Sequence, residues 1–127
     1  MHEMGVTRDL VDMVVACAEE RGAVEVSRVY LHIGFVRDIV DELLEGCFRW
    51  MARDTVAANA ELIIERIPFT VQCNQCGLIY AIDGNDESTW NCPICEKRDY
   101  HLNSGMEFFI SHIEMRFPEE EPVRACA

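Results

Sequence analysis

The chain has 127 residues, half of them hydrophobic, and a formal net charge of −12 at pH 7. This length fits one domain, or one domain with a small insert. The acidic balance argues against nucleic-acid binding, which needs Lys and Arg to neutralise phosphates, and no segment is long and apolar enough to predict a membrane span. Residues 1–3 lack the regions of a secretory signal, and seven cysteines, an odd number, fit a reducing compartment. We therefore expect a cytoplasmic protein.

The first three residues, Met1, His2 and Glu3, offer a candidate site for a metal ion. The terminal amine, the backbone nitrogen of His2 and its imidazole can close small fused chelate rings around one ion. Deprotonated amide nitrogens favour square-planar Ni²⁺ or Cu²⁺, and Glu3 can add a ligand through its backbone nitrogen or its side chain. A frayed terminus without function is the alternative, and these three residues alone leave it open.

A helix is predicted from Val6 to Arg21, because apolar residues recur there at steps of three and four. Gly22 is a natural stop for this helix. The predicted apolar face consists of Val6, Leu10, Met13, Val14 and Cys17. Met4 and Met13 carry soft sulfur atoms, but packing is the expected role of methionine in such a pattern.

The next stretch, from Ala23 to Gly34, is predicted to be a strand with Val29, Leu31 and Ile33 on one face and His32 on the other. A second amphipathic helix follows and reaches about Arg53. Asp38 is the expected cap of this helix, with Asp41 completing an imperfect capping box. Cys47 lies on its apolar stripe and is expected in the core.

A second strand is predicted from Ala60 to Ile67, closed by Pro68, and a third from Met106 to Phe117. The tail that begins at Pro118 is acidic and is expected to be loose. We assign no function to Cys126 in this tail.

Between these last two strands lie two Cys-x-x-Cys pairs, Cys73/Cys76 and Cys92/Cys95, separated by 15 residues. Two residues between cysteines let the chain turn so that both sulfurs face one point, and two such turns can surround one ion with four thiolates. A closed tetrahedral set of this kind predicts a structural Zn²⁺ site. Iron accepts the same ligands, so the spacing alone does not separate the two metals.

These elements predict an α+β fold: a small three-stranded sheet with two helices, plus an inserted zinc-ribbon-like tetracysteine module. The expected domains are 1–67 together with 105–127, and the module at 68–104. A module of this size has little core, so a bound metal is expected to stabilise it.

In combination, these motifs resemble the hydrogenase nickel-incorporation proteins of the HypA/HybF type. The resemblance rests on Met1-His2-Glu3, on Leu10-Val11-Asp12, on the Val-Tyr-Leu-His-Ile-Gly strand from Val29 to Gly34, and on the paired cysteines. It covers nearly the whole chain. Gly5 stands where the family is expected to have Ser, and the spacer between the cysteine pairs is slightly long, but neither departure touches a proposed ligand.

The resemblance implies a nickel metallochaperone and not an enzyme. Such a protein delivers Ni²⁺ to the large subunit of [NiFe]-hydrogenase, and in some bacteria to urease and its maturation proteins, and it works with a GTPase of the same pathway. By position, His2 is implied as the nickel ligand with Met1 and Glu3 contributing, and the four cysteines as the zinc ligands. No nucleophile–base pair, phosphate loop or catalytic carboxylate pair stands out in the sequence.

Two other functions compete with this interpretation. The cysteine pairs are also similar to those of rubredoxin, an iron–tetrathiolate electron carrier, although rubredoxin leaves about ninety residues of the α+β layer unexplained. A zinc-ribbon module that binds nucleic acid is the second alternative, and the acidity of the chain opposes it.

Overall fold

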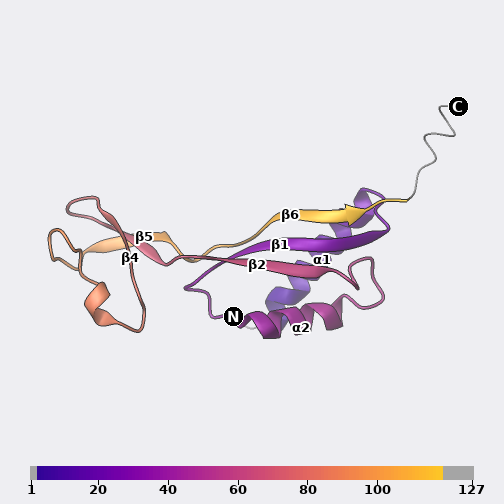
Figure 1. Cartoon of the computed structure of the whole chain (residues 1–127), viewed down its shortest axis with the longest axis horizontal. Helices are drawn as coiled ribbons and strands as arrows, with labels where there is room; N and C mark the ends of the chain where they lie inside the picture. The colour runs from indigo at the N-terminus through magenta and orange to yellow at the C-terminus, as the bar shows by residue number, and fades with distance from the viewer. Residues whose placement is uncertain (1–2, 119–127) are drawn as a thin grey trace, which may run out of the picture. The chain divides into compact units, whose positions relative to one another are not determined.

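The computed structural model describes residues 3–118, and of Glu3 only the backbone, so Met1, His2 and Cys126 lie outside the described residues. The elements in chain order are α1 (Glu3–Glu20), β1 (Glu25–Gly34), α2 (Asp41–Met51), β2 (Glu61–Ile67), β3 (Thr70–Cys73), β4 (Ile79–Ala81), the 3₁₀ helix η1 (Glu87–Thr89), β5 (Tyr100–Ser104) and β6 (Phe108–Arg116), as Figure 1 shows. The predicted fold class is confirmed: two helices accompany a small three-stranded sheet, and a four-cysteine cluster lies between β2 and β6.

The chain forms two compact units. The first contains the residues up to Tyr30, Ile39–Ile63 and the residues from Ser111 onward, and the second contains Leu31–Asp38 and Ile64–Ile110. Compactness does not show which segments fold independently, so the predicted domains, 1–67 with 105–127 and 68–104, stay a prediction. Neither α-helix of the described chain combines the length and the apolar character that a membrane crossing requires.

Helix α1 ends as predicted. Gly22 adopts a positive φ of 75°, its N–H donates to the carbonyl of Glu19, and the N–H of Ala23 donates to the carbonyl of Ala18. This pair of bonds is the Schellman pattern, in which glycine relieves the strain of a left-handed residue. Leu10 and Val14 of the predicted apolar face are buried, whereas Met13 is 59% exposed and Cys17 is half-buried. The buried residues of the helix are Thr7, Leu10, Val11, Val14 and Ala18.

Helix α2 begins later than predicted, and Asp38 does not cap it. Val40 occupies the N-cap position without a side-chain capping bond, because a turn closed by Arg37 N–H and the carbonyl of Gly34 precedes the helix. Ile39 before the cap and Leu44 in the first turns are both buried, which is the pattern of a hydrophobic staple. Apolar packing therefore sets the start of this helix.

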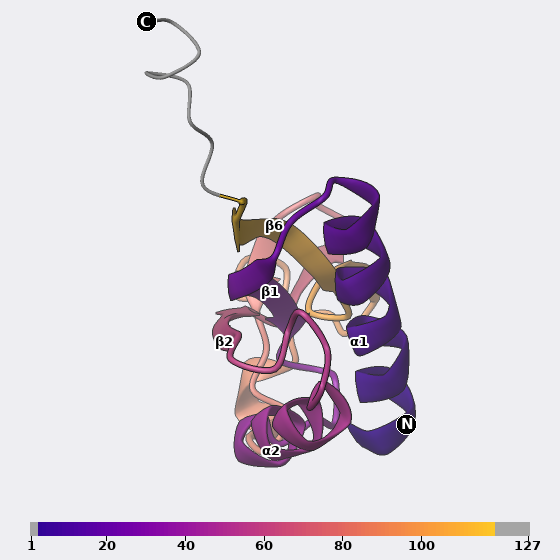
Figure 2. The ribbon, with the colours of Figure 1, turned by 90° about the vertical axis from the view of Figure 1, so that its right-hand side faces the viewer.

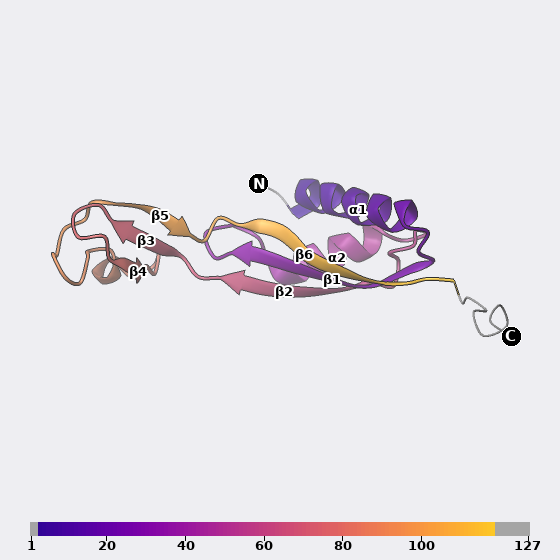
Figure 3. The same cartoon turned by 90° about the horizontal axis from the view of Figure 1, so that it is seen from above.

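The first sheet has the order β2-β1-β6, and Figures 2 and 3 show α1 and α2 on the same face of it. In the first unit this face holds an apolar core in which Val14, Val26, Val29, Leu44 and Phe48 are each at most 2% exposed. The predicted apolar row of β1 is confirmed, since Leu31 and Ile33 are also fully buried. Cys47, expected in the core, is only half-buried.

The second unit contains a sheet that the sequence did not predict. Its order is β4-β3-β5, with β3 antiparallel to both neighbours. Cys73 at the end of β3 pairs with Tyr100 of β5. Because Cys73 is the last residue of β3, this sheet sets the position of the first cysteine pair.

Candidate metal centres

Four sulfur atoms converge in the second unit. The Sγ atoms of Cys73, Cys76, Cys92 and Cys95 all lie within 4.8 Å of one another. Cys73 and Cys95 are 3.4 Å apart, and Cys76 and Cys92 are 3.5 Å apart. Among the described residues this is the one place where three or more His, Cys, Asp or Glu side chains gather as metal ligands could.

The two cysteine pairs stand on two turns with the same hydrogen-bond pattern. In the first, Cys73 N–H donates to the carbonyl of Leu78, and Gly77 N–H donates to the carbonyl of Cys73. In the second, Cys92 N–H donates to the carbonyl of Lys97, and Glu96 N–H donates to the carbonyl of Cys92. The fifth residue of each turn has a positive φ, 80° at Gly77 and 62° at Glu96. The repeated geometry aims both pairs of sulfurs at one point.

The thiols influence each other strongly. The backbone N–H of Cys76 is the main cause that lowers the pKa of Cys73 to about 6, and the N–H of Cys95 lowers the pKa of Cys92. For Cys76 the N–H of Leu78 acts to lower the pKa, but the hydrogen bond to Cys92, burial and the Cys73 charge together raise it to about 11. The pKa is thus lowered at Cys73 and Cys92 and raised at Cys76, and a bound cation would favour the thiolate form of all four sulfurs.

This donor set fits a zinc ion. Zinc binds thiolate sulfur at about 2.3 Å, so a tetrahedral site needs sulfurs roughly 3.8 Å apart. The observed spacings lie close to that value, and Cys73 and Cys92 are buried. A zinc ion held by all four cysteines would have no open coordination position.

Asp99 supports the first turn, and the sequence analysis missed it. Its carboxylate accepts hydrogen bonds from Asn74 Nδ2 (2.8 Å) and Gln75 Nε2 (3.0 Å), the two residues between Cys73 and Cys76. These bonds lower the pKa of Asp99. The two amides between the cysteines were the one available signal that such a partner exists.

The histidines of the described chain do not gather into a site. His32 stacks on Phe109 with ring centres 4.8 Å apart, and His112 stacks on Tyr30 at 3.9 Å. The Nδ1 atom of His101 lies 2.7 Å from the side-chain oxygen of Asn74. The predicted nickel ligands Met1 and His2, and the side chain of Glu3, lie outside the described residues, so their role stays a prediction.

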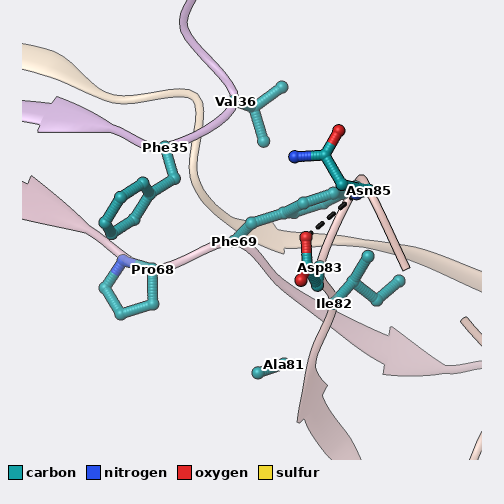
Figure 4. Close-up of a pocket in the computed structure, with 9 residues that line it drawn as sticks. Phe35, Val36, Pro68, Phe69, Ala81, Ile82, Asp83 and Asn85 are labelled. Atoms are coloured by element: carbon teal, nitrogen blue, oxygen red, sulfur yellow. Dashed lines mark hydrogen bonds between the residues drawn. The ribbon is translucent and has the colours of Figure 1, made fainter. Parts of the chain in front are cut away.

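A surface pocket of about 590 Å³ in the second unit has a different character (Figure 4). One side is apolar, with Phe35, Val36, Pro68 and Phe69, and the other is formed by residues 81–85. Asp83 supplies the single carboxylate of its lining, and one of its oxygens accepts the N–H of Asn85 at 2.9 Å. The pocket contains none of the predicted metal ligands.

Comparison with known proteins decides the family. The family model described as hydrogenase/urease nickel incorporation, metallochaperone, HypA, matches residues 1–115. The chain belongs to the HypA family. The curated hydrogenase maturation factor HypA of Dehalococcoides mccartyi (strain CBDB1) is 36% identical, covering 91% of this chain and 94% of the relative. HypA of Methanosarcina mazei is 33% identical, covering 94% of this chain and 96% of the relative.

Solved HypA structures share the fold. The solution structure of the nickel metallochaperone HypA from Helicobacter pylori covers 93% of this chain and all of its own, with a TM-score of 0.64 at 21% identity. A second HypA solution structure covers 91% of this chain and 96% of its own, with a TM-score of 0.68 at 22% identity. As a HypA protein, the chain is a nickel metallochaperone that acts with the hydrogenase maturation machinery.

Proposed function

We propose that this HypA protein carries Ni²⁺ on its first three residues and delivers it during the maturation of [NiFe]-hydrogenase. The amine of Met1, the backbone nitrogen of His2 and its imidazole bind the ion, and Glu3 adds a further ligand. The observation that carries the proposal is the family match, which extends from residue 1 to residue 115 and so includes these ligands.

The chemistry of the ligands suits transfer. Ligands at a chain terminus can be exchanged one at a time for those of an acceptor, so the ion need never be released to water. Amide nitrogens bind only after losing a proton, so nickel affinity falls in acid. Cu²⁺ binds such a site more tightly than Ni²⁺, and selectivity therefore comes from metal availability and partner docking.

The four cysteines hold a structural zinc ion in this proposal. The convergence of Cys73, Cys76, Cys92 and Cys95 supports it. When bound, zinc supplies charge that keeps all four sulfurs ionised and ties the two turns together. Asp99 and its two amide partners orient the turn that carries Cys73 and Cys76.

The proposed partners follow from the proposed cargo. The acceptor is the large subunit of [NiFe]-hydrogenase, and a maturation GTPase of the nickel pathway acts with the protein in the cytoplasm. The family description also names urease, whose maturation proteins are a second set of acceptors to test. The curated relatives are named hydrogenase maturation factors, which favours hydrogenase as the acceptor.

A His2→Ala variant tests the nickel site. We expect nickel binding by calorimetric titration to be lost while one zinc ion per chain and the folded structure are kept, because the two sites share no ligand. His112→Ala is the matched control, since His112 is exposed and stacks on Tyr30. If the His2 variant binds nickel as the unchanged protein does, the site lies elsewhere, with His32, His101 and His112 as the next candidates.

A further inference from the structure

A shallow groove of about 340 Å³ lies where α1 and α2 pack together in the first unit. Its lining residues are Met4, Glu42, Leu43, Gly46, Cys47 and Trp50. Two sulfur atoms meet in it, because Cys47 Sγ lies 3.5 Å from Met4 Sδ. Met4 is 53% exposed, so packing in the core does not account for its place there.

A thiol beside a thioether is a pair of soft donors. Thioethers bind hard and borderline divalent ions poorly, whereas thiolate and thioether together favour Cu(I). We propose that Met4 and Cys47 form a soft-metal site that binds one Cu(I) ion. The proposal is independent of the nickel proposal, since it rests on the described sulfurs and not on residues 1–3.

The geometry allows both sulfurs to bind one ion. At a metal–sulfur bond length of about 2.3 Å, the sulfurs must be roughly 3.8 Å apart in tetrahedral geometry and about 4.6 Å apart in a linear one. The observed separation is 3.5 Å. Met4 has three rotatable side-chain bonds and an exposed end, so a rotation of its side chain supplies the difference.

Two other sulfurs of α1, in Met13 and Cys17, provide a contrast. Met13 of α1 is even more exposed than Met4, but it does not line the groove. Cys17 of α1 lies 2.9 Å from a guanidinium nitrogen of Arg21, and this positive charge opposes the approach of a cation. Within the lining of the groove, Met4 and Cys47 are the two residues that carry sulfur, and their sulfurs lie together.

Binding exchanges a proton for the ion. Cys47 loses its thiol proton to solvent as the copper–sulfur bond forms, Met4 donates a lone pair without losing a proton, and copper stays Cu(I) throughout. Trp50 lines the same groove, so its fluorescence should change when the site fills.

The test is an anaerobic titration of the zinc-loaded full chain with Cu(I), in competition with bicinchoninate. A Cys126→Ser background removes the thiol of the tail. We compare Met4→Leu and Cys47→Ser with the matched controls Met13→Leu and Cys17→Ser. Zinc release is followed with a coloured chelator, and iodoacetamide labelling followed by peptide mass spectrometry reports which cysteine the first copper ion protects.

We expect the first Cu(I) to bind without zinc release and to protect Cys47 from alkylation. Affinity should fall roughly tenfold or more in both groove variants, since even groups outside a ligand shell change metal affinity by about 10- to 100-fold, and it should not change in the controls. If Cys47→Ser fails to fold, Met4→Leu still tests the proposal, because Met4 is half-exposed and its replacement should not disturb folding. Zinc release with the first copper, unprotected Cys47, or equal effects in groove and control variants would each overturn the proposal.

Discussion

At the scale of single residues, Glu114 of β6 organises the open face of the first unit's sheet. Its carboxylate accepts hydrogen bonds from Arg28 Nη1 (2.9 Å) and the hydroxyl of Tyr30 (3.1 Å). The bond from Arg28 is the largest cause that holds the pKa of Glu114 below its ordinary value. These hydrogen bonds hold the side chains of Arg28 and Tyr30 on β1 and of Glu114 on β6 in one arrangement.

Replacing Glu114 with Gln should therefore lower stability at neutral pH. Because the folded-state pKa is depressed, this stabilisation is present above the ordinary pKa of a glutamate and is lost as pH falls through the folded value. Thermal unfolding at pH 7, 5 and 3.5 checks this, with the exposed Glu19→Gln as control. A difference between the Glu114 variant and the unchanged protein that persists undiminished at the lowest pH contradicts the assignment.

The donor atoms of the cysteine cluster could be predicted from sequence, but their supporting residue could not. The spacing within Cys73-x-x-Cys76 is a local property of the chain, and the turn follows from it. Asp99 reaches Asn74 and Gln75 only because β5 runs beside β3. Such contacts depend on strand pairing, which a single sequence does not reveal.

At the scale of elements, the two cysteine turns carry different residues at the position after their second cysteine. Gly77 and Glu96 both have a positive φ, a conformation that costs a residue with a side chain about 1 kcal/mol. The first turn avoids this cost with glycine and the second does not.

Gly77→Ala should therefore destabilise the zinc-loaded module by about 1 kcal/mol. Glu96→Ala should change stability by less than about 0.5 kcal/mol, since the strain is already present there. Urea unfolding of the zinc-loaded protein measures both. Equal losses in the two variants would show that φ at this position is not the cause.

Two glycines, Gly34 and Gly105, meet where β1 and the segment after β5 approach each other. A Cβ added at Gly34 would overlap the backbone carbonyl of Gly105, which itself has a φ of 126°. We expect Gly34→Ala to cost about 1–3 kcal/mol through overpacking. Gly46 in α2 has open space around it, so Gly46→Ala should instead raise the stability of the protein by about 1 kcal/mol through helix propensity. Urea unfolding should therefore show midpoint shifts of opposite sign for the two variants.

The elements predicted best are those whose signal is local in the sequence. The alternation in β1 and the glycine stop of α1 each lie within a short stretch of sequence, and both are confirmed. The second sheet was missed because β4 has only three residues and β3 only four, too few to show a period. The predicted start of α2 was wrong because the burial of Ile39, and not side-chain capping by Asp38, determines where the helix begins.

At the scale of the whole molecule, buried apolar side chains are unevenly distributed along the chain. The first unit has a continuous apolar core, whereas buried apolar side chains are few among residues 68–104. A metal ion can replace hydrophobic burial in a segment of that size.

Zinc removal should thus loosen residues 68–104 and spare α1 and α2. We expect a strong chelator, or Cys76→Ser or Cys92→Ser, to speed limited proteolysis between Pro68 and Gly105. Cys17→Ser, which removes a half-buried thiol outside the cluster, is the control. Equal resistance of the segment after complete zinc removal would contradict a structural role for the metal.

Under the proposed function, the amine of Met1 and the imidazole of His2 bind nickel together. The most direct measurement compares untagged protein with and without N-terminal acetylation, which removes the amine donor and adds no side chain. We expect acetylation to weaken nickel binding and to change the visible absorption of the nickel complex, while zinc content stays at one ion per chain. Identical spectra and affinities in the two forms would contradict it.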